Sequence, residues 1–134
     1  GYVDWPQANL VSGVRLEQFE RDLRRGDGNE LRMKFCAVHS SAALAVNCFA
    51  PFRQRITDLT LPNLHAFKTL QFERKCPTGL RGGRSPNLDV LLSGPDGVVG
   101  VESKLTEHLA RQKKAAFSPA YAEQIRDDHG FAIG

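Results

Sequence analysis

The chain has 134 residues, of which 41% are hydrophobic and 25% are charged. This length suits one domain with its own core, and the composition excludes the disordered and low-complexity classes. The longest uncharged stretch, residues 38–52, is shorter than the ~20 apolar residues of a membrane-spanning helix, and the first residues lack a signal-peptide pattern. Three widely spaced cysteines disfavour a disulfide framework and indicate a reducing compartment, so we expect a cytoplasmic protein.

The net charge of +3 at pH 7 is unevenly distributed along the chain. Between Lys68 and Lys114 there are nine Lys/Arg and five Asp/Glu, a balance of 9 − 5 = +4, which leaves the rest at −1. A basic excess beside acidic residues is expected where a polyanion is held against metal-binding carboxylates. An ordinary solvated face has the same composition, so the charge alone decides nothing.

The N-terminal half predicts two helices. Residues 14–25 carry apolar side chains at helical spacing and are followed by glycine, which predicts an amphipathic helix of about three turns. Residues 30–50 show a longer apolar face that Pro51 ends, which predicts a second, more buried helix. Because Ser side chains can bond back to the preceding turn, the His-Ser-Ser sequence at 39–41 predicts a kink.

The next segments predict three strands. Residues 65–75 alternate partly between polar and apolar, which predicts a strand, and the Gly- and Pro-rich residues 77–87 predict a loop. The apolar runs 88–93 and 98–105 flank the turn signal SGPDG and predict a hairpin.

The remaining residues predict two helices, 105–116 and 118–129, and the final FAIG predicts the start of a further strand. This element order indicates an α+β protein within the broad α/β class. We expect a single domain over residues 1–134, with 1–28 as an N-terminal helical extension and 29–134 as the core. The missing initiator Met favours a piece excised from a longer protein.

The loop length of the hairpin determines which side chains face one another. A four-residue loop, 94–97, pairs Ser93 with Val98, and counting outward places Asp89 directly opposite Glu102. Opposed residues share a face with Cβ atoms about 4.5–5.5 Å apart. Two carboxylates at that separation repel each other unless a cation lies between them, so the pairing predicts a metal.

Lys104 lies two residues after Glu102, so on a strand its side chain projects on the same face. Oxygen ligands suit Mg²⁺, which takes one or two carboxylates plus phosphate oxygens, polarises a phosphodiester and lowers the pKa of a bound water. The lysine can stabilise the transition state, or orient and help deprotonate the attacking water. Asp89, Glu102 and Lys104 therefore predict magnesium-dependent phosphodiester cleavage.

An acid and a Glu-Ser-Lys triplet on neighbouring strands also describe a solvent-facing, salt-bridged hairpin. Here the acids interrupt runs that are otherwise apolar, a pattern typical of strands covered on both faces. Buried charges without a partner are unfavourable, so their presence favours a site.

The string GGRSPNLDVLLSGPDGVVGVESKL, residues 82–105, resembles the PD-(D/E)xK nuclease superfamily. The family's Pro-Asp pair is here PNLD, with Pro86 three residues before Asp89. The resemblance implies a restriction-endonuclease-like core of helix, three-stranded mixed sheet, helix and fourth strand, with Asp89 and Glu102 as metal ligands and Lys104 as the catalytic lysine. It also implies Mg²⁺ replaceable by Mn²⁺, duplex or branched DNA as substrate, and a homodimer, since such nucleases often cut two strands as dimers.

Many superfamily members carry a further acid, and two positions here can supply it. Glu30 opens the second helix, where its charge also suits the helix dipole. Glu73, at the end of the strand that neighbours the hairpin, is the preferred candidate, with a surface salt bridge to Arg74 or Lys75 as the alternative. The carbonyl oxygen of Ser103 is a further candidate metal ligand.

Basic residues around the hairpin are candidates for phosphate contacts, with a solvated loop or helix face as the alternative. Flexible glycine backbone in the loop before Asp89 would let a phosphate approach closely. The predicted DNA-binding residues are Lys75, Arg81, Arg84, Arg111, Lys113 and Lys114.

Other candidate sites do not match a known pattern. Cys36 and His39 are three residues apart, but the other cysteines do not complete a zinc spacing, so we expect both to be core residues. Ser40 and Ser41 lack the GxSxG setting of a hydrolase, and no phosphate-binding P-loop is present.

Three functions follow from these patterns. The leading hypothesis is a magnesium-dependent DNA endonuclease. The second is a nucleic-acid-binding or assembly module that keeps the nuclease fold without cutting, which the complete Asp, Glu and Lys set disfavours. The third is a small structural domain, which predicts that Asp89 and Glu102 point to opposite sides.

Overall fold

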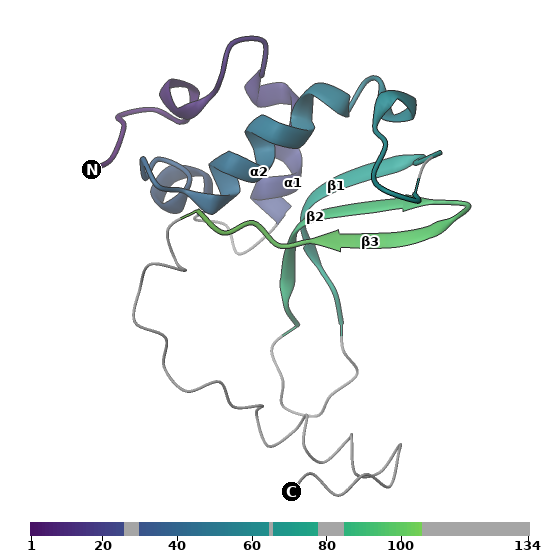
Figure 1. Ribbon diagram of the computed structural model, residues 1–134. Helices are drawn as coiled ribbons and strands as arrows, with labels where there is room; N and C mark the ends of the chain where they lie inside the picture. Colours follow the sequence, from purple (N-terminus) through teal and green to yellow (C-terminus); the bar gives the residue numbers. More distant parts are fainter. Residues whose placement is uncertain (26–29, 65, 78–84, 106–134) are drawn as a thin grey trace, which may run out of the picture.

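Short helices cover one face of a three-stranded antiparallel sheet (Figure 1). The computed structural model describes residues 1–25, 30–64, 66–77 and 85–105, without the side chains of residues 30 and 32. The strands are β1 (Thr69–Lys75), β2 (Asn87–Gly94) and β3 (Gly97–Val101), and the α-helices are α1 (Glu20–Arg25) and α2 (Ser41–Phe49). Shorter turns of helix span Pro6–Asn9, Leu16–Gln18, Glu30–Lys34, Ala50–Phe52 and Ile56–Asp58.

This arrangement confirms the predicted α+β class. The strands lie in the order β1-β2-β3 and pair antiparallel, with β2 in the centre. Within the described ranges, no helix combines the length and the apolar character needed to cross a membrane. The helices and the fourth strand predicted for residues 106–134 lie outside the described residues.

The first predicted helix is shorter than expected. A 3₁₀ turn over Leu16–Gln18 precedes α1, because the chain leaves the helical conformation at Phe19, where φ is −142°. The Phe19 ring is fully buried, stacked on Phe35 at 5.2 Å between ring centroids and edge-on to Phe72 at 6.4 Å. The N-terminal segment thus contributes to the same core as the sheet.

The second predicted helix is not continuous. Ser40 is in an extended conformation and its Oγ accepts a hydrogen bond from the backbone N–H of Ala43 at 3.1 Å, which caps a new helix, α2. Just before it, the N–H of Val3 donates to the carbonyl of Cys36 and the N–H of Val38 to that of Gly1. Pairing with the N-terminus draws this segment out of helical geometry, so the expected kink is a break.

The hairpin register is the one that the sequence predicts. Ser93 pairs with Val98. Gly94 also pairs with Gly97, so the loop proper has two residues, Pro95-Asp96, and not four. Gly97 has φ of +135°, a conformation that favours glycine.

The sheet core and its edge both anchor the helices. Val90 and Leu92 of β2 are completely buried. At the edge strand β1, the N–H of Phe72 points to α1 and donates to Asp22 Oδ2 at 3.1 Å. Arg53 donates to the same oxygen, and its guanidinium lies 5.9 Å from the Phe72 ring centroid. Asp22 therefore covers the sheet edge and fixes α1 against it.

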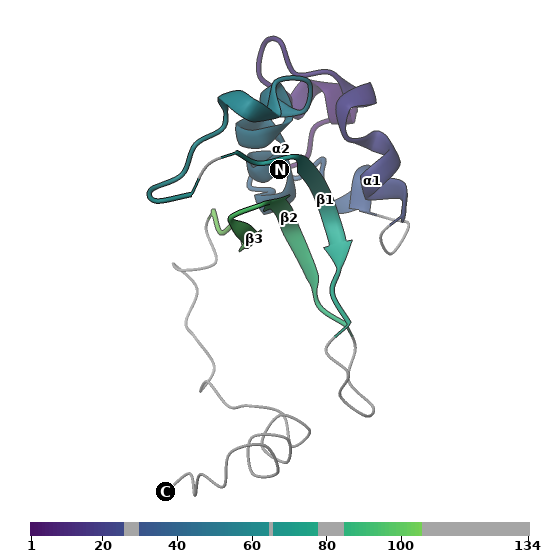
Figure 2. The same cartoon turned by 90° about the vertical axis from the view of Figure 1, so that its right-hand side faces the viewer.

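Beyond the end of β3, β1 and β2 continue as a two-stranded ribbon. Figures 1 and 2 both show this ribbon extending away from the helical layer. The segment that follows β3 passes beneath the helices instead. The ribbon and the segment after β3 diverge here, and the candidate site described below lies between them and the helical layer.

Candidate active site

A cleft of about 440 Å³ opens where the ribbon and the segment after β3 meet the N-terminal end of α2. All four residues predicted to be catalytic contribute to it, although they come from three separate segments. Its described lining is Tyr2, Lys34, Ala37, His39, Ser40, Ser41, Ala42, Glu73, Asn87, Asp89, Glu102 and Lys104.

Three of the carboxylates stand in one row across the sheet. The pairing of β2 with β3 ends at Val90 with Val101, which leaves Asp89 and Glu102 as the next residues on the two segments. On the other edge of β2, the pairs of Phe72 with Val90 and of Arg74 with Leu88 leave Glu73 of β1 at the position facing Asp89. Asp89 is therefore flanked by an acid on each side, and the cleft faces a concentration of negative charge.

The segment after β3 is held to β2 by Asp89 itself. The backbone N–H of Ser103, a buried residue, donates to Asp89 Oδ2 at 2.5 Å. Strand β3 ends at Val101, so the expectation that Lys104 lies on a continuous strand is wrong. The hydrogen bond curves the chain after Val101 and brings Lys104 into the cleft.

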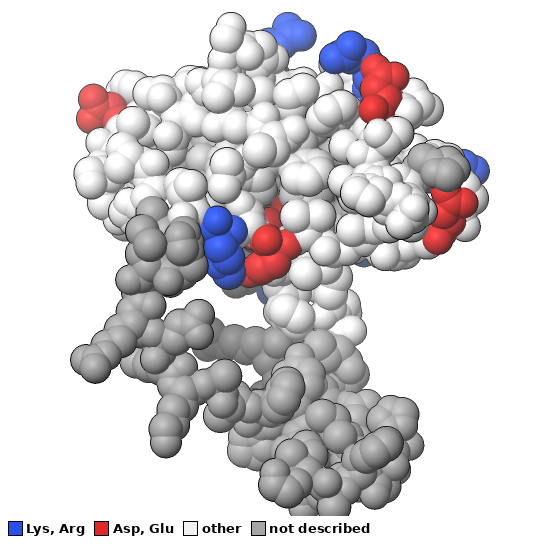
Figure 3. All heavy atoms as spheres, viewed as in Figure 1, with Lys and Arg blue, Asp and Glu red and all other residues white. Residues whose placement is uncertain are grey.

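Lys104 and Glu102 form an ion pair within the cleft, with Lys104 Nζ 2.5 Å from Glu102 Oε1. Both side chains are about half exposed, 52% and 50% respectively, so solvent and a ligand can reach them. Acidic and basic groups also lie side by side at the lower margin of the described surface in Figure 3, where most of the face is uncharged. The half-exposed ammonium of Lys104 is therefore accessible from the cleft and lies beside one of its acids.

Glu73 occupies a strained position in the row. Its φ is +47°, which is uncommon for a residue with a side chain. The regular pairing of β1 with β2 includes Phe72 and Arg74 but skips Glu73 and Asp89. Strain of this kind is found at functional sites, where the surrounding structure maintains it.

This strain predicts a difference between two substitutions at Glu73. Because both remove the carboxylate, Glu73→Gly and Glu73→Ala differ mainly in how easily they adopt a positive φ. We expect Glu73→Gly to be more stable than Glu73→Ala by about 1 kcal/mol, measured as the free energy of unfolding in urea. Equal stability of the two variants would show that the backbone at this position is relaxed.

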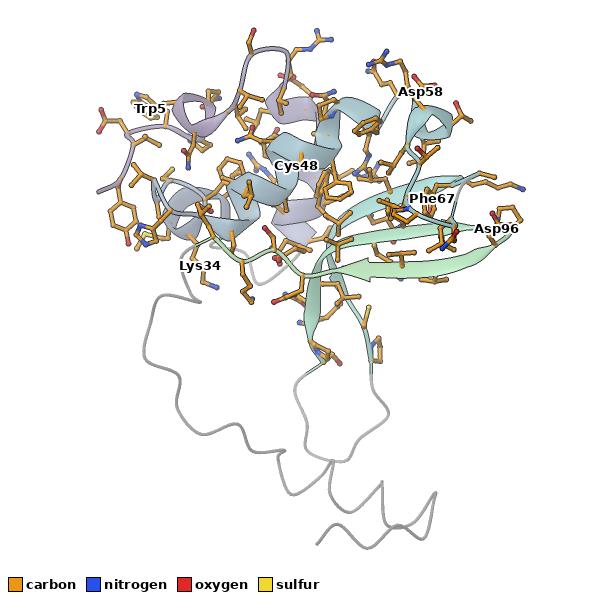
Figure 4. All side chains as sticks on the ribbon, viewed as in Figure 1. Trp5, Lys34, Cys48, Asp58, Phe67 and Asp96 are labelled. Atoms are coloured by element: carbon orange, nitrogen blue, oxygen red, sulfur yellow. The ribbon has the colours of Figure 1, made fainter. Side chains whose placement is uncertain are left out.

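The wall opposite the acids is basic and polar. Lys34 lies on the underside of the helical layer, towards the segment after β3 (Figure 4). His39 is exposed and lines the cleft, so its prediction as a core residue is wrong, whereas Cys36 is buried as predicted. Ser40 caps α2 and Ser41 begins it, which directs the positive end of that helix towards the cleft.

The predicted DNA-binding residues are only partly visible. Lys75 is exposed at the end of β1, on the ribbon beside the cleft. The other five lie outside the described part of the structure: Arg81, Arg84, Arg111, Lys113 and Lys114. The side chain of Glu30, the alternative candidate for the further acid, lies outside it as well.

The side chains of the cleft offer oxygen donors of the kind that a magnesium ion binds. Within the described ranges, no three His, Cys, Asp or Glu side chains are grouped closely enough to hold a metal. Magnesium requires only one or two carboxylates, with water and phosphate oxygens completing its shell. The cleft offers Asp89 and Glu102, and the buried Oδ1 of Asn87 has no hydrogen-bond partner in the described structure. The donor types therefore fit this ion.

A larger cleft of about 530 Å³ lies on the side of α1, between Arg15 and Arg53. Its buried acid, Asp22, already accepts hydrogen bonds from Arg53 and from the backbone of Phe72. Because these hydrogen bonds give Asp22 a structural role, the cleft at Asp89 is the stronger candidate for the active site.

Comparison with known families gives a match over nearly the whole chain. The family described as Restriction Endonuclease associating with ARP matches residues 3–132, nearly the whole chain. The chain belongs to this family. The match confirms the restriction-endonuclease-like resemblance that residues 82–105 and the element order indicated. No curated protein and no solved structure gives a match.

Within this restriction-endonuclease family member, sequence reasoning missed part of the cleft. Lys34, His39 and Asn87 line it and were not among the predicted site residues. Asn87 could have been found, because it precedes Asp89 by two residues and therefore shares its face of a strand. Lys34 and His39 could not, since only the break before α2 brings them over the hairpin.

Proposed function

We propose that this chain is a metal-dependent endonuclease that hydrolyses DNA phosphodiester bonds at the cleft of Asp89. The observation that carries the proposal is the convergence of Glu73, Asp89, Glu102 and Lys104 on one cleft from three segments. Membership of a restriction-endonuclease family supports the reaction class.

Asp89 and Glu102 are the proposed metal ligands, with Glu73 and the Ser103 carbonyl as additional oxygen donors. When bound, Mg²⁺, or Mn²⁺ in its place, supplies charge that polarises the phosphate and acidifies water. Asp89 also holds the chain after β3 through the Ser103 N–H, so the same side chain positions Glu102 and Lys104.

Lys104 is the proposed cationic group for the reacting phosphate. In the structure it pairs with Glu102, which keeps its ammonium within the acidic row. A preorganised cation at the developing negative charge stabilises the transition state. The same ammonium can orient the attacking water, and kinetic comparison of variants distinguishes these roles.

The opposite wall suits the DNA backbone. Lys34, the exposed His39 and the positive end of α2 face the acids across the cleft, an arrangement that attracts a phosphate between the two walls. Lys75 extends this basic surface, and we propose that Arg81, Arg84, Arg111, Lys113 and Lys114 add to it. The partner is duplex or branched DNA, and a homodimer would allow both strands to be cut.

A supercoiled plasmid tests the proposal directly. We expect the chain to nick or linearise the plasmid with Mg²⁺ and to be inactive with EDTA. We expect Asp89→Asn to be inactive as well, since the amide replaces a carboxylate ligand with a neutral group. Undiminished cutting in EDTA would contradict the metal requirement.

The same assay distinguishes a second function. The described residues contain no preformed cluster of three metal-ligating side chains, and the family is named for association with ARP. Both observations favour a module that binds nucleic acid or a protein partner without cutting. Tight binding of DNA with no cleavage under any divalent cation would establish that alternative.

A further inference from the structure

Asn87, in the wall of the acidic cleft, has a buried side-chain oxygen without a hydrogen-bond partner in the described structure. It begins β2, two residues before Asp89, and both residues line the cleft. Its Oδ1 is buried and has no hydrogen-bond partner in the described structure. Buried polar atoms are nearly always paired, so an exception indicates a ligand, a water or an ion that completes the site.

The residues around Asn87 Oδ1 restrict which group can be its missing partner. Glu73, Asp89 and Glu102 line the same cleft, and ionised carboxylates accept hydrogen bonds but cannot donate them. Lys104, in the described segment after β3, is paired with Glu102. Oxygen acceptors are thus concentrated on this wall, and a cation is a group that several of them can bind at once.

The chemistry of the amide oxygen suits such a cation. Side-chain amide oxygens are hard, neutral ligands that bind divalent ions alongside carboxylates. A neutral ligand also completes the coordination without adding to the repulsion between Asp89 and its flanking acids. We propose that Asn87 Oδ1 is a further ligand of the divalent cation, directly or through one of its waters. This inference rests on the proposed metal-dependent function.

Titration with Mn²⁺ alone, followed by calorimetry and by the electron paramagnetic resonance signal of free Mn²⁺, tests the assignment without an activity assay. We expect Asn87→Leu, which keeps a similar volume but no oxygen, to bind Mn²⁺ on the order of tenfold more weakly than the unaltered chain. Asn87→Asp, which keeps the oxygen, is expected to bind at least as tightly as the unaltered chain.

Gln71→Leu is the matched control. Gln71 is also an amide on a strand of the sheet, but it pairs with Leu91 and is not part of the described cleft lining. Its Mn²⁺ affinity should equal that of the unaltered chain. Circular dichroism of each variant verifies that the sheet is retained, and Asn87→Asp tests the oxygen if Asn87→Leu does not fold.

Two results would overturn the assignment while leaving the proposed function intact. The first is a folded Asn87→Leu variant that binds Mn²⁺ as tightly as the unaltered chain. The second is an Asn87→Asp variant that binds as weakly as Asn87→Leu, because this would assign the effect to the amide nitrogen. Absence of Mn²⁺ binding by the unaltered chain would overturn the proposed metal-dependent function together with this inference.

Discussion

Replacement of Lys104 by alanine is expected to reduce DNA cleavage about 10²–10³-fold, the usual effect of removing one preorganised group that stabilises transition-state charge. The ammonium lies 2.5 Å from Glu102 Oε1, and both residues line the acidic cleft. Single-turnover cleavage of a labelled duplex measures the chemical step, while filter binding of the same duplex reports affinity.

The affinity measurement distinguishes a role of Lys104 in the chemical step from a role in binding the DNA. If Lys104 acts on the reacting phosphate, the cleavage rate should fall far more than the DNA affinity. Lys68→Ala is the matched control, because Lys68 is exposed just before β1, at the opposite end of the sheet from the cleft. A Lys104→Ala variant that cuts within about threefold of the unaltered chain would contradict the assigned role.

Replacement of Asp22 by alanine is expected to give the largest loss of stability outside the apolar core, about 3 kcal/mol in the free energy of unfolding. The substitution leaves Arg53 without its carboxylate and the N–H of Phe72 without its acceptor. The expected loss is at the lower end of the range for buried pairs because the Arg53 side chain is 31% exposed. The urea midpoint measures the loss.

Two further variants test whether the stability loss of Asp22→Ala comes from the hydrogen bonds and the ion pair of Asp22. Asp22→Asn keeps an acceptor for the Phe72 N–H but removes the charge, so its stability should lie between those of Asp22→Ala and the unaltered chain. Glu20→Ala removes a more exposed ion pair with Arg24 on the same helix and should change stability by less than about 1 kcal/mol. If Asp22→Ala is no worse than Glu20→Ala, the network at the sheet edge does not hold α1.

The hairpin was the most predictable part of the protein. Two apolar runs and the turn signal SGPDG between them specify both strands locally, so the pairing of Ser93 with Val98 followed from counting. The loop itself is two residues shorter than expected, but symmetric closing at Gly94 and Gly97 leaves the register unchanged. Register is robust here because a one-residue slip would expose Val90 and Leu92.

The helices were predicted less well, since their boundaries depend on partners that are distant in sequence. The periodicity of residues 30–50 is real, yet pairing with residues 1–3 breaks the helix before Ser40. In the same way the burial of Phe19 between Phe35 and Phe72 interrupts the first helix. Local propensity is weak compared with such tertiary contacts.

The sequence by itself determined the hairpin register up to the pair of Val90 with Val101, and the restriction-endonuclease-like resemblance, because a short hairpin and a short motif are local. Only the tertiary structure decided the shape of the cleft. The Ser103 N–H bound to Asp89 turns Lys104 inward, the positive φ of Glu73 interrupts regular pairing in the acidic row, and the break before α2 brings in His39. Each of these depends on contacts between segments far apart in the chain, and no pattern of neighbouring residues encodes them.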